Sequence, residues 1–181
     1  MNEEQEKNPW TVIFTADEIA AIVHQLAREI SAGYRQKQTD EPLLIVGILA
    51  GALVFMADLI REMTIPVELD FLRLSSYGTA HVSSGHVRLL SEPVKPLAGR
   101  HVLLLDDMID SGRTLAFARQ YLLDHGAVDV EIVVLLDKKS PRKEDVFCRY
   151  IGAEVENKFL GGYGLDGGHY FAQNRDIFYV E

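Results

Sequence analysis

The chain has little cysteine and no excess of positive charge. Cys148 is the single cysteine among 181 residues, which excludes an intramolecular disulfide and a metal cluster held by several thiolates. Lysine and arginine number 18 against 27 aspartates and glutamates, and the formal net charge is -9. Binding along a nucleic-acid backbone needs a broad basic surface, so we expect no nucleic-acid partner. The cysteine usage fits a cytoplasmic protein.

A long apolar run of the kind that crosses a membrane is also missing. The uncharged stretch from Leu43 to Ala57 is shorter than the roughly 20 residues that a membrane helix needs. Asp58 closes the stretch, and Gly47 and the small residues Ala50-Gly51-Ala52 interrupt it. A buried strand that turns tightly into a helix explains this composition better. We therefore expect no membrane partner.

The apolar residues that are present follow strand and helix patterns in turn. Thr15 and Glu18 predict a capping box at the start of a helix that ends near Gly33, and further helices are expected after Ala52 and from about Thr114. Buried strands are expected at residues 43–49, 67–74, 102–105 and 131–136, an edge strand at 87–90, and short strands at 149–151 and 177–180. Strands alternating with helices predict an α/β fold, with a mostly parallel twisted sheet flanked by helices.

The stretch VLLLDDMIDSGRTL at residues 102–115 has the strongest functional signal. Four apolar residues predict a buried strand, and the acids Asp106 and Asp107 follow where that strand should end. A short loop with a third acid, two hydroxyls and a glycine then opens into a helix. Free backbone N–H groups at a helix start favour anions. The pattern predicts a phosphate site beside acids that suit a metal or sugar hydroxyls.

Several other polar or small residues fall at the ends of predicted strands. In mostly parallel sheets, ligands bind outside the carboxyl ends of the strands. The residues expected at that edge are Gly51, Asp106, Asp107, Asp110, Lys138 and Asp166. We expect them to converge on one ligand site.

The motif VLLLDDMIDSGRTL closely resembles the phosphoribosyl-diphosphate binding motif of the type I phosphoribosyltransferases. DFLRLSSYG (70–78), LLDKKSPR (135–142) and NKFLGGYGLD (157–166) resemble the hypoxanthine-guanine branch of that family, in the same order. The resemblance covers the chain from about residue 43 to the C-terminus. It implies the type I phosphoribosyltransferase fold, in which the terminal segments form a small hood and a flexible loop serves catalysis.

The resemblance also implies the organisation and the reaction. Residues 1–181 would form a single domain, with a core at about 35–150 and a base-binding hood from about 1–34 and 151–181. The reaction would transfer 5-phosphoribosyl from phosphoribosyl diphosphate to hypoxanthine or guanine in purine salvage, with Mg²⁺ as cofactor. Because members of this family usually form dimers or tetramers, a homo-oligomer is expected.

Carried over residue by residue, the resemblance gives Asp110 the exchange of a proton with the purine ring. Aspartate is also a favoured helix N-cap, and one residue can serve both roles. Asp106 and Asp107 match the acidic pair that holds the ribose hydroxyls and orients Mg²⁺. The remaining residues of the phosphoribosyl-diphosphate site would be Ser111, Gly112, Arg113 and Thr114 at the 5′-phosphate, with Ala50 and Gly51 at the diphosphate.

The base site is implied by the two later motifs. Lys138 matches a lysine that donates a hydrogen bond to the 6-oxo group of the purine. An ammonium can only donate, and adenine has an amino group at that position, so this lysine would distinguish 6-oxopurines from adenine. Phe159 matches the aromatic residue that stacks on the base, and Leu160 would present backbone groups to its edge. Asp166 matches a base-site carboxylate that also ligates a second Mg²⁺. Read without the resemblance, Lys138 would be an ordinary surface lysine and Phe159 a core residue.

Two other features concern the catalytic loop and the diphosphate. Ser76 and Tyr77 match the tip of a loop that folds over the site.

The family often has lysine where this chain has Ala50, in a turn whose peptide bond is often cis. It usually has arginine where this chain has Ala172, while Arg175 lies three residues further on. These departures concern contacts to the leaving group.

Two alternatives remain open. The first is a phosphoribosyltransferase of other base specificity, for xanthine or a pyrimidine. The second is a weakly catalytic nucleotide-sensing protein with the same fold, which the departures at the diphosphate favour. The retained Asp110 and the lack of a basic DNA-binding face argue against the sensor.

Overall fold

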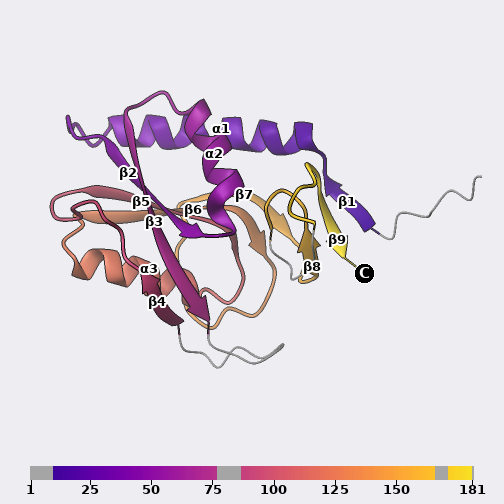
Figure 1. The fold of residues 1–181 in the computed structure, drawn as a ribbon. Helices are drawn as coiled ribbons and strands as arrows, with labels where there is room; N and C mark the ends of the chain where they lie inside the picture. The colour runs from indigo at the N-terminus through magenta and orange to yellow at the C-terminus, as the bar shows by residue number, and fades with distance from the viewer. Residues whose placement is uncertain (1–9, 77–86, 166–170, 181) are drawn as a thin grey trace, which may run out of the picture.

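The computed structural model describes residues 10–76, 87–165 and 171–180 of the 181-residue chain. Within these residues, the centre is a six-stranded sheet with the order β4-β3-β2-β5-β6-β7 (Figure 1). Its strands are β2 (Leu43–Leu49), β3 (Val67–Ser76), β4 (Val87–Ser91), β5 (His101–Ile109), β6 (Asp129–Lys138) and β7 (Tyr150–Val155). Neighbouring strands are parallel except for the edge strand β4, which is antiparallel to β3. The predicted mostly parallel sheet is confirmed.

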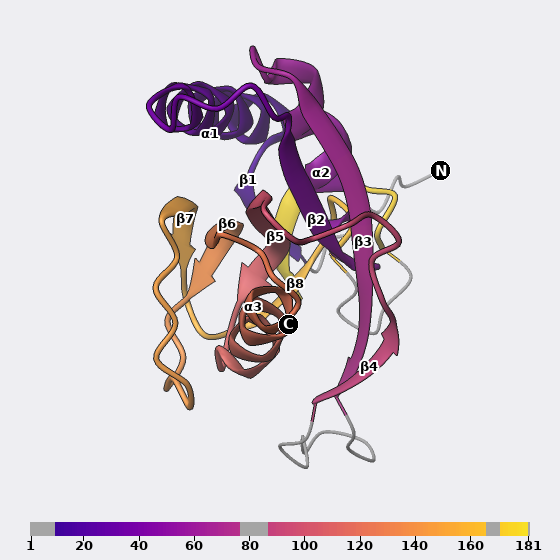
Figure 2. The ribbon, with the colours of Figure 1, turned by 90° about the vertical axis from the view of Figure 1, so that its left-hand side faces the viewer.

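The central strands bury both of their faces under helices. The helices are α1 (Ala16–Arg35), α2 (Ala52–Glu62) and α3 (Arg113–Asp124). Leu103 and Leu105 of β5 pack in the cluster that contains α1 and α2, whereas Val102 and Leu104 pack in the cluster that contains α3. Figure 2 shows the helices on these two sides of the sheet. Burial on both faces explains why β5 begins as a continuous apolar run. None of the helices in the described residues is long and apolar enough to cross a bilayer.

Helix α1 begins with the predicted capping box. The Thr15 hydroxyl accepts a hydrogen bond from the Glu18 backbone N–H at 3.4 Å. In return, the Glu18 carboxylate accepts one from the Thr15 N–H at 2.8 Å. These bonds satisfy backbone donors that a helix start otherwise leaves open.

A smaller antiparallel sheet joins the two ends of the described chain, in the order β1-β9-β8. Its strands are β1 (Trp10–Phe14), β8 (Phe159–Gly161) and β9 (Ile177–Val180). The Ala16 backbone N–H donates to Asp176 Oδ1 at 2.8 Å, and the Trp10 ring stacks on Phe178 with centroids 4.7 Å apart. The sequence predicted β9 but neither β1 nor β8. The partner of β1 lies at the other end of the chain, and β8 has only three residues at the start of a glycine-rich segment.

Strand β5 is longer than the sequence predicted, and this changes the position of the acids. It continues to Ile109, and Asp106 pairs with Val134 of β6 in the parallel ladder. The acidic pair therefore lies within the strand rather than after it. Strand β7 is also longer than the predicted 149–151, since it extends to Val155.

Candidate active site

Asp106 and Asp107 lie side by side near the carboxyl end of β5. Asp106 is only 9% exposed. Burial raises the pKa of Asp106 well above its ordinary value, and the adjacent Asp107 charge raises it further. The described residues contain no group of three or more His, Cys, Asp or Glu side chains that could hold a metal alone. Mg²⁺ commonly uses one or two carboxylates with substrate oxygens and waters, so this pair fits a site that a substrate completes.

The turn from β2 into α2 packs against Asp107. Its Leu49–Ala50 peptide bond is cis. A Cβ atom built on Gly51 would lie 2.2 Å from Asp107 Oδ2, so a larger residue would displace the carboxylate. Because β2 and β5 are parallel neighbours, the predicted diphosphate turn and the acidic pair meet at one edge of the sheet.

The loop after β5 forms a small hollow at the start of α3. Gly112 is the N-cap residue of α3, with a φ of 83°. A Cβ atom there would lie 2.6 Å from the Glu144 carbonyl oxygen, so both conformation and space require glycine. The hollow has a volume of about 90 Å³ and is lined by Asp106, Met108, Ile109, Asp110, Ser111, Gly112, Thr114 and Leu115. A helix start with hydroxyls beside it suits a phosphate group. Arg113 begins α3 but does not line the hollow.

Asp110 does not cap α3, because Gly112 occupies the N-cap position and no side chain caps the helix there. The Asp110 carboxylate instead accepts a hydrogen bond from the Ser140 hydroxyl at 2.5 Å. Its other oxygen lies 3.6 Å from the Lys138 ammonium, and the side chain is 52% exposed. The alternative of a capping residue is therefore wrong here, and the carboxylate remains accessible to a ligand.

A second cavity adjoins the phosphate hollow and shares Asp110 with it. Its volume is about 240 Å³, and it is lined by Asp107, Met108, Asp110, Lys138, Phe159, Leu160 and Leu165. The Lys138 ammonium lies 5.8 Å from the centroid of the Phe159 ring. Phe159 is 62% exposed, whereas Leu160 beside it is buried. An exposed aromatic face beside a cation and a carboxylate suits a flat polar ring.

Comparison with known proteins agrees with this arrangement. A family model described as the phosphoribosyl transferase domain matches residues 9–167. The chain belongs to the phosphoribosyltransferase family. The hypoxanthine-guanine phosphoribosyltransferase of Aquifex aeolicus is 37% identical over 170 residues, which are 94% of each chain. That of Bacillus subtilis is 38% identical and covers 93% of this chain and 90% of the relative. The structure of Trypanosoma cruzi hypoxanthine phosphoribosyltransferase with the product IMP has a TM-score of 0.86 at 32% identity, covering 94% of this chain and 93% of that one.

This phosphoribosyltransferase brings most of the predicted residues to one edge of the sheet. Asp106, Asp107, Asp110 and Lys138 line the two adjoining cavities, and the diphosphate turn packs against Asp107. Asp166 and Tyr77 lie outside the described residues. Ser76 ends β3, where its backbone pairs with Val87 of β4.

Two side chains of the phosphoribosyltransferase site were not predicted to have a role. Ser140 donates to the carboxylate of Asp110, and Arg142 donates to backbone carbonyl oxygens of the same loop. Both belong to the motif LLDKKSPR, which was interpreted for its lysine. Sequence pattern gave no further signal, because these contacts cross about thirty positions of the chain and depend on how β5 and β6 pair.

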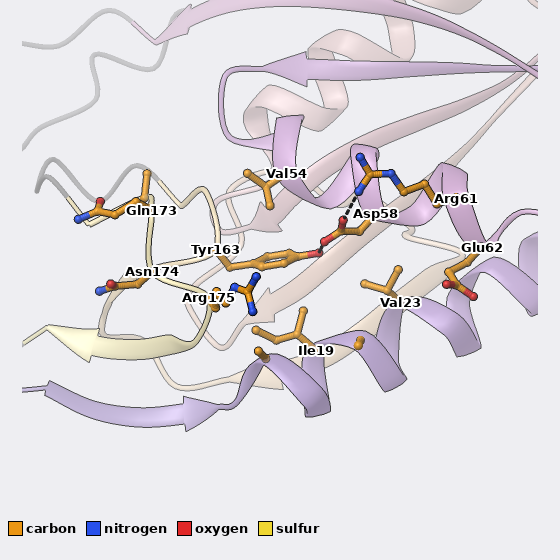
Figure 3. Close-up of a pocket in the computed structure, with 13 residues that line it drawn as sticks. Ile19, Val23, Val54, Asp58, Arg61, Glu62, Tyr163, Gln173, Asn174 and Arg175 are labelled. Carbon is orange, nitrogen blue, oxygen red and sulfur yellow. Dashed lines mark hydrogen bonds and ion pairs between the residues drawn. The ribbon is translucent and has the colours of Figure 1, made fainter.

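A larger cavity of about 580 Å³ lies away from the acids, between α1, α2 and the segment before β9 (Figure 3). Ala172 and Arg175 both line it, and neither lines the two cavities at the acids. The Tyr163 hydroxyl crosses to α2 and donates to Asp58 Oδ2 at 2.7 Å. Burial raises the pKa of the Tyr163 phenol, and the hydrogen bond and charge of Asp58 raise it further. Arg175 could have replaced the arginine that the family has at the position of Ala172, but it lines this cavity and not the two at the acids.

Proposed function

We propose that this phosphoribosyltransferase transfers 5-phosphoribosyl from phosphoribosyl diphosphate to hypoxanthine or guanine, giving IMP or GMP and diphosphate. The observation that carries the proposal is the shared position of Asp110, which lines both the phosphate hollow and the cavity of Lys138 and Phe159. A single carboxylate is thereby within reach of a ribose 5-phosphate on one side and a purine on the other. The relatives with hypoxanthine in their names support the same substrates.

Each group has a role in this reaction. The bond from ribose C1′ to the diphosphate oxygen breaks, the diphosphate leaves with the bonding electrons, and a purine ring nitrogen forms the new bond to C1′. Asp110 accepts the ring proton that the purine loses. Lys138 donates to the 6-oxo group, which adenine lacks. Phe159 stacks on the ring, and the start of α3 holds the 5′-phosphate in place.

Mg²⁺ is the proposed cofactor. Asp106 and Asp107 would hold it, because two packed carboxylates, one of them buried, gain from a nearby cation. When bound, the ion would neutralise charge on the diphosphate and so help it to leave. The same acids would hold the ribose hydroxyls. Second-magnesium ligation by Asp166 and a catalytic loop that contains Tyr77 are further parts of the proposal. Ser76 pairs with Val87 at the end of β3, so it would lie where this loop begins and not at its tip.

Turnover of a panel of bases tests the proposal. The protein is supplied with phosphoribosyl diphosphate, Mg²⁺ and, in turn, hypoxanthine, guanine, xanthine, adenine, uracil or orotate, and each nucleotide product is measured. We expect IMP and GMP to form and AMP to be absent. Turnover of xanthine or a pyrimidine alone would favour the first alternative. IMP binding without turnover of any base would favour the sensor.

We further propose that the protein is a cytoplasmic homo-oligomer, a dimer or a tetramer. Leu53 is a large apolar residue on α2 with 53% of its surface exposed, and an interface would cover it. Light scattering coupled to size-exclusion chromatography should give a mass of two or four chains of 20.3 kDa. The mass of one chain at micromolar concentration would contradict this.

A further inference from the structure

The segment after β6 wraps around the loop that bears Asp110. Its backbone N–H groups at Lys143 and Glu144 donate to the Ser111 carbonyl oxygen at 2.9 and 3.2 Å. The Ser140 N–H donates to the Lys138 carbonyl oxygen at 2.8 Å, which fixes the serine directly beside the base site. The segments that follow the carboxyl ends of β5 and β6 are thus joined by hydrogen bonds outside the sheet.

Arg142 strengthens this connection. Its guanidinium donates to the carbonyl oxygens of Ile109 at 3.3 Å and Lys138 at 3.1 Å. It also donates to the Asp110 carbonyl oxygen and pairs with the Asp137 carboxylate. An arginine fork has five donors in fixed geometry. One side chain therefore holds the backbone of Asp110 and Lys138, two of the residues that line the proposed base cavity.

The two carboxylate oxygens of Asp110 have different environments. Oδ1 accepts the Ser140 hydroxyl at 2.5 Å. Oδ2 has the Lys138 ammonium at 3.6 Å, which is longer than the roughly 2.7–3.2 Å of an N–H···O hydrogen bond. The first oxygen is engaged by a direct hydrogen bond, whereas the second faces the cation across a gap.

We propose that Ser140 is a positioning residue that holds Oδ1 and thereby assigns proton exchange with the purine to Oδ2. This inference rests on the proposed function, because it requires that Asp110 accepts the ring proton. A carboxylate attached through rotatable bonds otherwise samples orientations in which neither oxygen meets the purine nitrogen. Ser140 itself takes no proton in the reaction, so its effect passes through Asp110 alone.

The test is a double-mutant cycle with Ser140→Ala and Asp110→Asn, measured as the single-turnover rate with hypoxanthine and as the dissociation constant for IMP. Ser140→Ala should lower the rate about tenfold, a part of what a positioned acid or base contributes, while IMP affinity changes less than about twofold. Ser140→Thr keeps the hydroxyl and should restore most of the rate. In the Asp110→Asn background, Ser140→Ala should cause no further loss.

A control variant separates positioning from general disturbance of the segment. The Lys139 ammonium pairs with Glu154 at 2.7 Å, and both side chains are 65% exposed. Lys139→Ala should leave the single-turnover rate within about twofold of the wild type.

The outcomes distinguish failure of the inference from failure of the proposed function. A wild-type rate for Ser140→Ala would overturn the positioning role of Ser140. So would a loss of rate from Ser140→Ala in the Asp110→Asn background as large as in the wild type. Neither result would affect the proton role of Asp110. A wild-type rate for Asp110→Asn overturns the proton role of Asp110, and the inference about Ser140 with it. If Ser140→Thr is as slow as Ser140→Ala, the hydroxyl is not the group that positions Asp110, and the inference fails.

Discussion

The two sides of the candidate active site, the phosphate and base cavities and the turn from β2 into α2, are held in different ways. At the 5′-phosphate and base side, the ends of β5 and β6 are joined by side chains, with Ser140 on Asp110 and Arg142 on three carbonyl oxygens. At the diphosphate side, small residues let the backbone pack closely. A Cβ atom on Gly51 would lie 2.2 Å from an Asp107 oxygen, and one on Gly164 would lie 2.7 Å from the Val54 side chain.

The positions at which this chain differs from the family pattern lie on the second of these sides. The side proposed to bind the 5′-phosphate and to exchange the proton has the charged and hydroxyl groups that the resemblance implies. The side that handles the leaving group has Ala50 and Ala172, and Arg175 lines a cavity elsewhere. Recognition of the diphosphate should therefore rest mainly on backbone groups and Mg²⁺, and the following changes test that contrast.

The largest effect is expected from Gly112→Ala. Its positive φ and the Glu144 carbonyl oxygen 2.6 Å from a new Cβ both oppose the change, so the phosphate loop must move. We expect kcat/KM to fall about a hundredfold, as for a small misplacement of reacting groups. Gly99→Ala is the matched control, because Gly99 has a φ of 78° but nothing within 4 Å of its Cβ position. It should lower Tm by a few degrees, through backbone strain of about 1–3 kcal/mol, and leave kcat/KM unchanged. Equal activity losses in the two variants would refute the account of this loop.

Gly51→Ala should have a smaller effect, mainly on the diphosphate side. Gly51 has a φ of -56°, so the backbone tolerates alanine and only the Asp107 carboxylate must give way. We expect the KM for phosphoribosyl diphosphate to rise about tenfold and the dissociation constant for IMP to rise less, because IMP lacks the diphosphate but keeps the ribose hydroxyls that Asp107 is proposed to hold. Steady-state kinetics with varied phosphoribosyl diphosphate, together with IMP titration, measures both. A matching loss of IMP affinity would show that the two sides are not separable.

Ala50→Lys should have the smallest effect and the opposite sign. It restores the side-chain charge that the resemblance places in the diphosphate turn. An exposed charge pair contributes up to about 1 kcal/mol, so the KM for phosphoribosyl diphosphate should fall about threefold. The KM for hypoxanthine should stay the same. An unchanged KM for phosphoribosyl diphosphate would mean that the backbone of this turn already provides all of its contribution.

The sequence predicted the features that depend on local pattern. Continuous apolar runs predicted the central strands, and the Thr15–Glu18 pair predicted the start of α1. The order of strands and helices predicted the shared edge of Asp107 and Lys138. Strand β1 was missed because its partner β9 lies at the far end of the chain, and β8 was missed because it has three residues at the start of a glycine-rich segment. The length of β5 was underestimated because two acids ordinarily end an apolar strand, whereas here both lie within the strand and Asp106 pairs with Val134 of β6.

Side-chain contacts across the chain were beyond sequence reasoning. The sequence allowed Asp110 to cap α3. In the structure, Gly112 is the N-cap residue, in a left-handed conformation, and no side chain caps the helix. The hydrogen bond that Asp110 does make comes from Ser140, which follows the next strand. The pairing of β5 with β6 and the contacts of Arg142 beyond it bring these two residues together.

The most direct test of the central claim, that one edge of the sheet is a site for phosphoribosyl transfer to a 6-oxopurine, is the ratio of kcat/KM for hypoxanthine to that for adenine. In the wild type we expect a preference for hypoxanthine of at least about a thousandfold, because a site built to hydrogen-bond a group rejects an analogue without it. Lys138→Met keeps the length of the side chain without its donors, and it should remove most of that preference by slowing hypoxanthine. Comparable use of adenine by the wild type, or an undiminished preference in Lys138→Met, would contradict the claim.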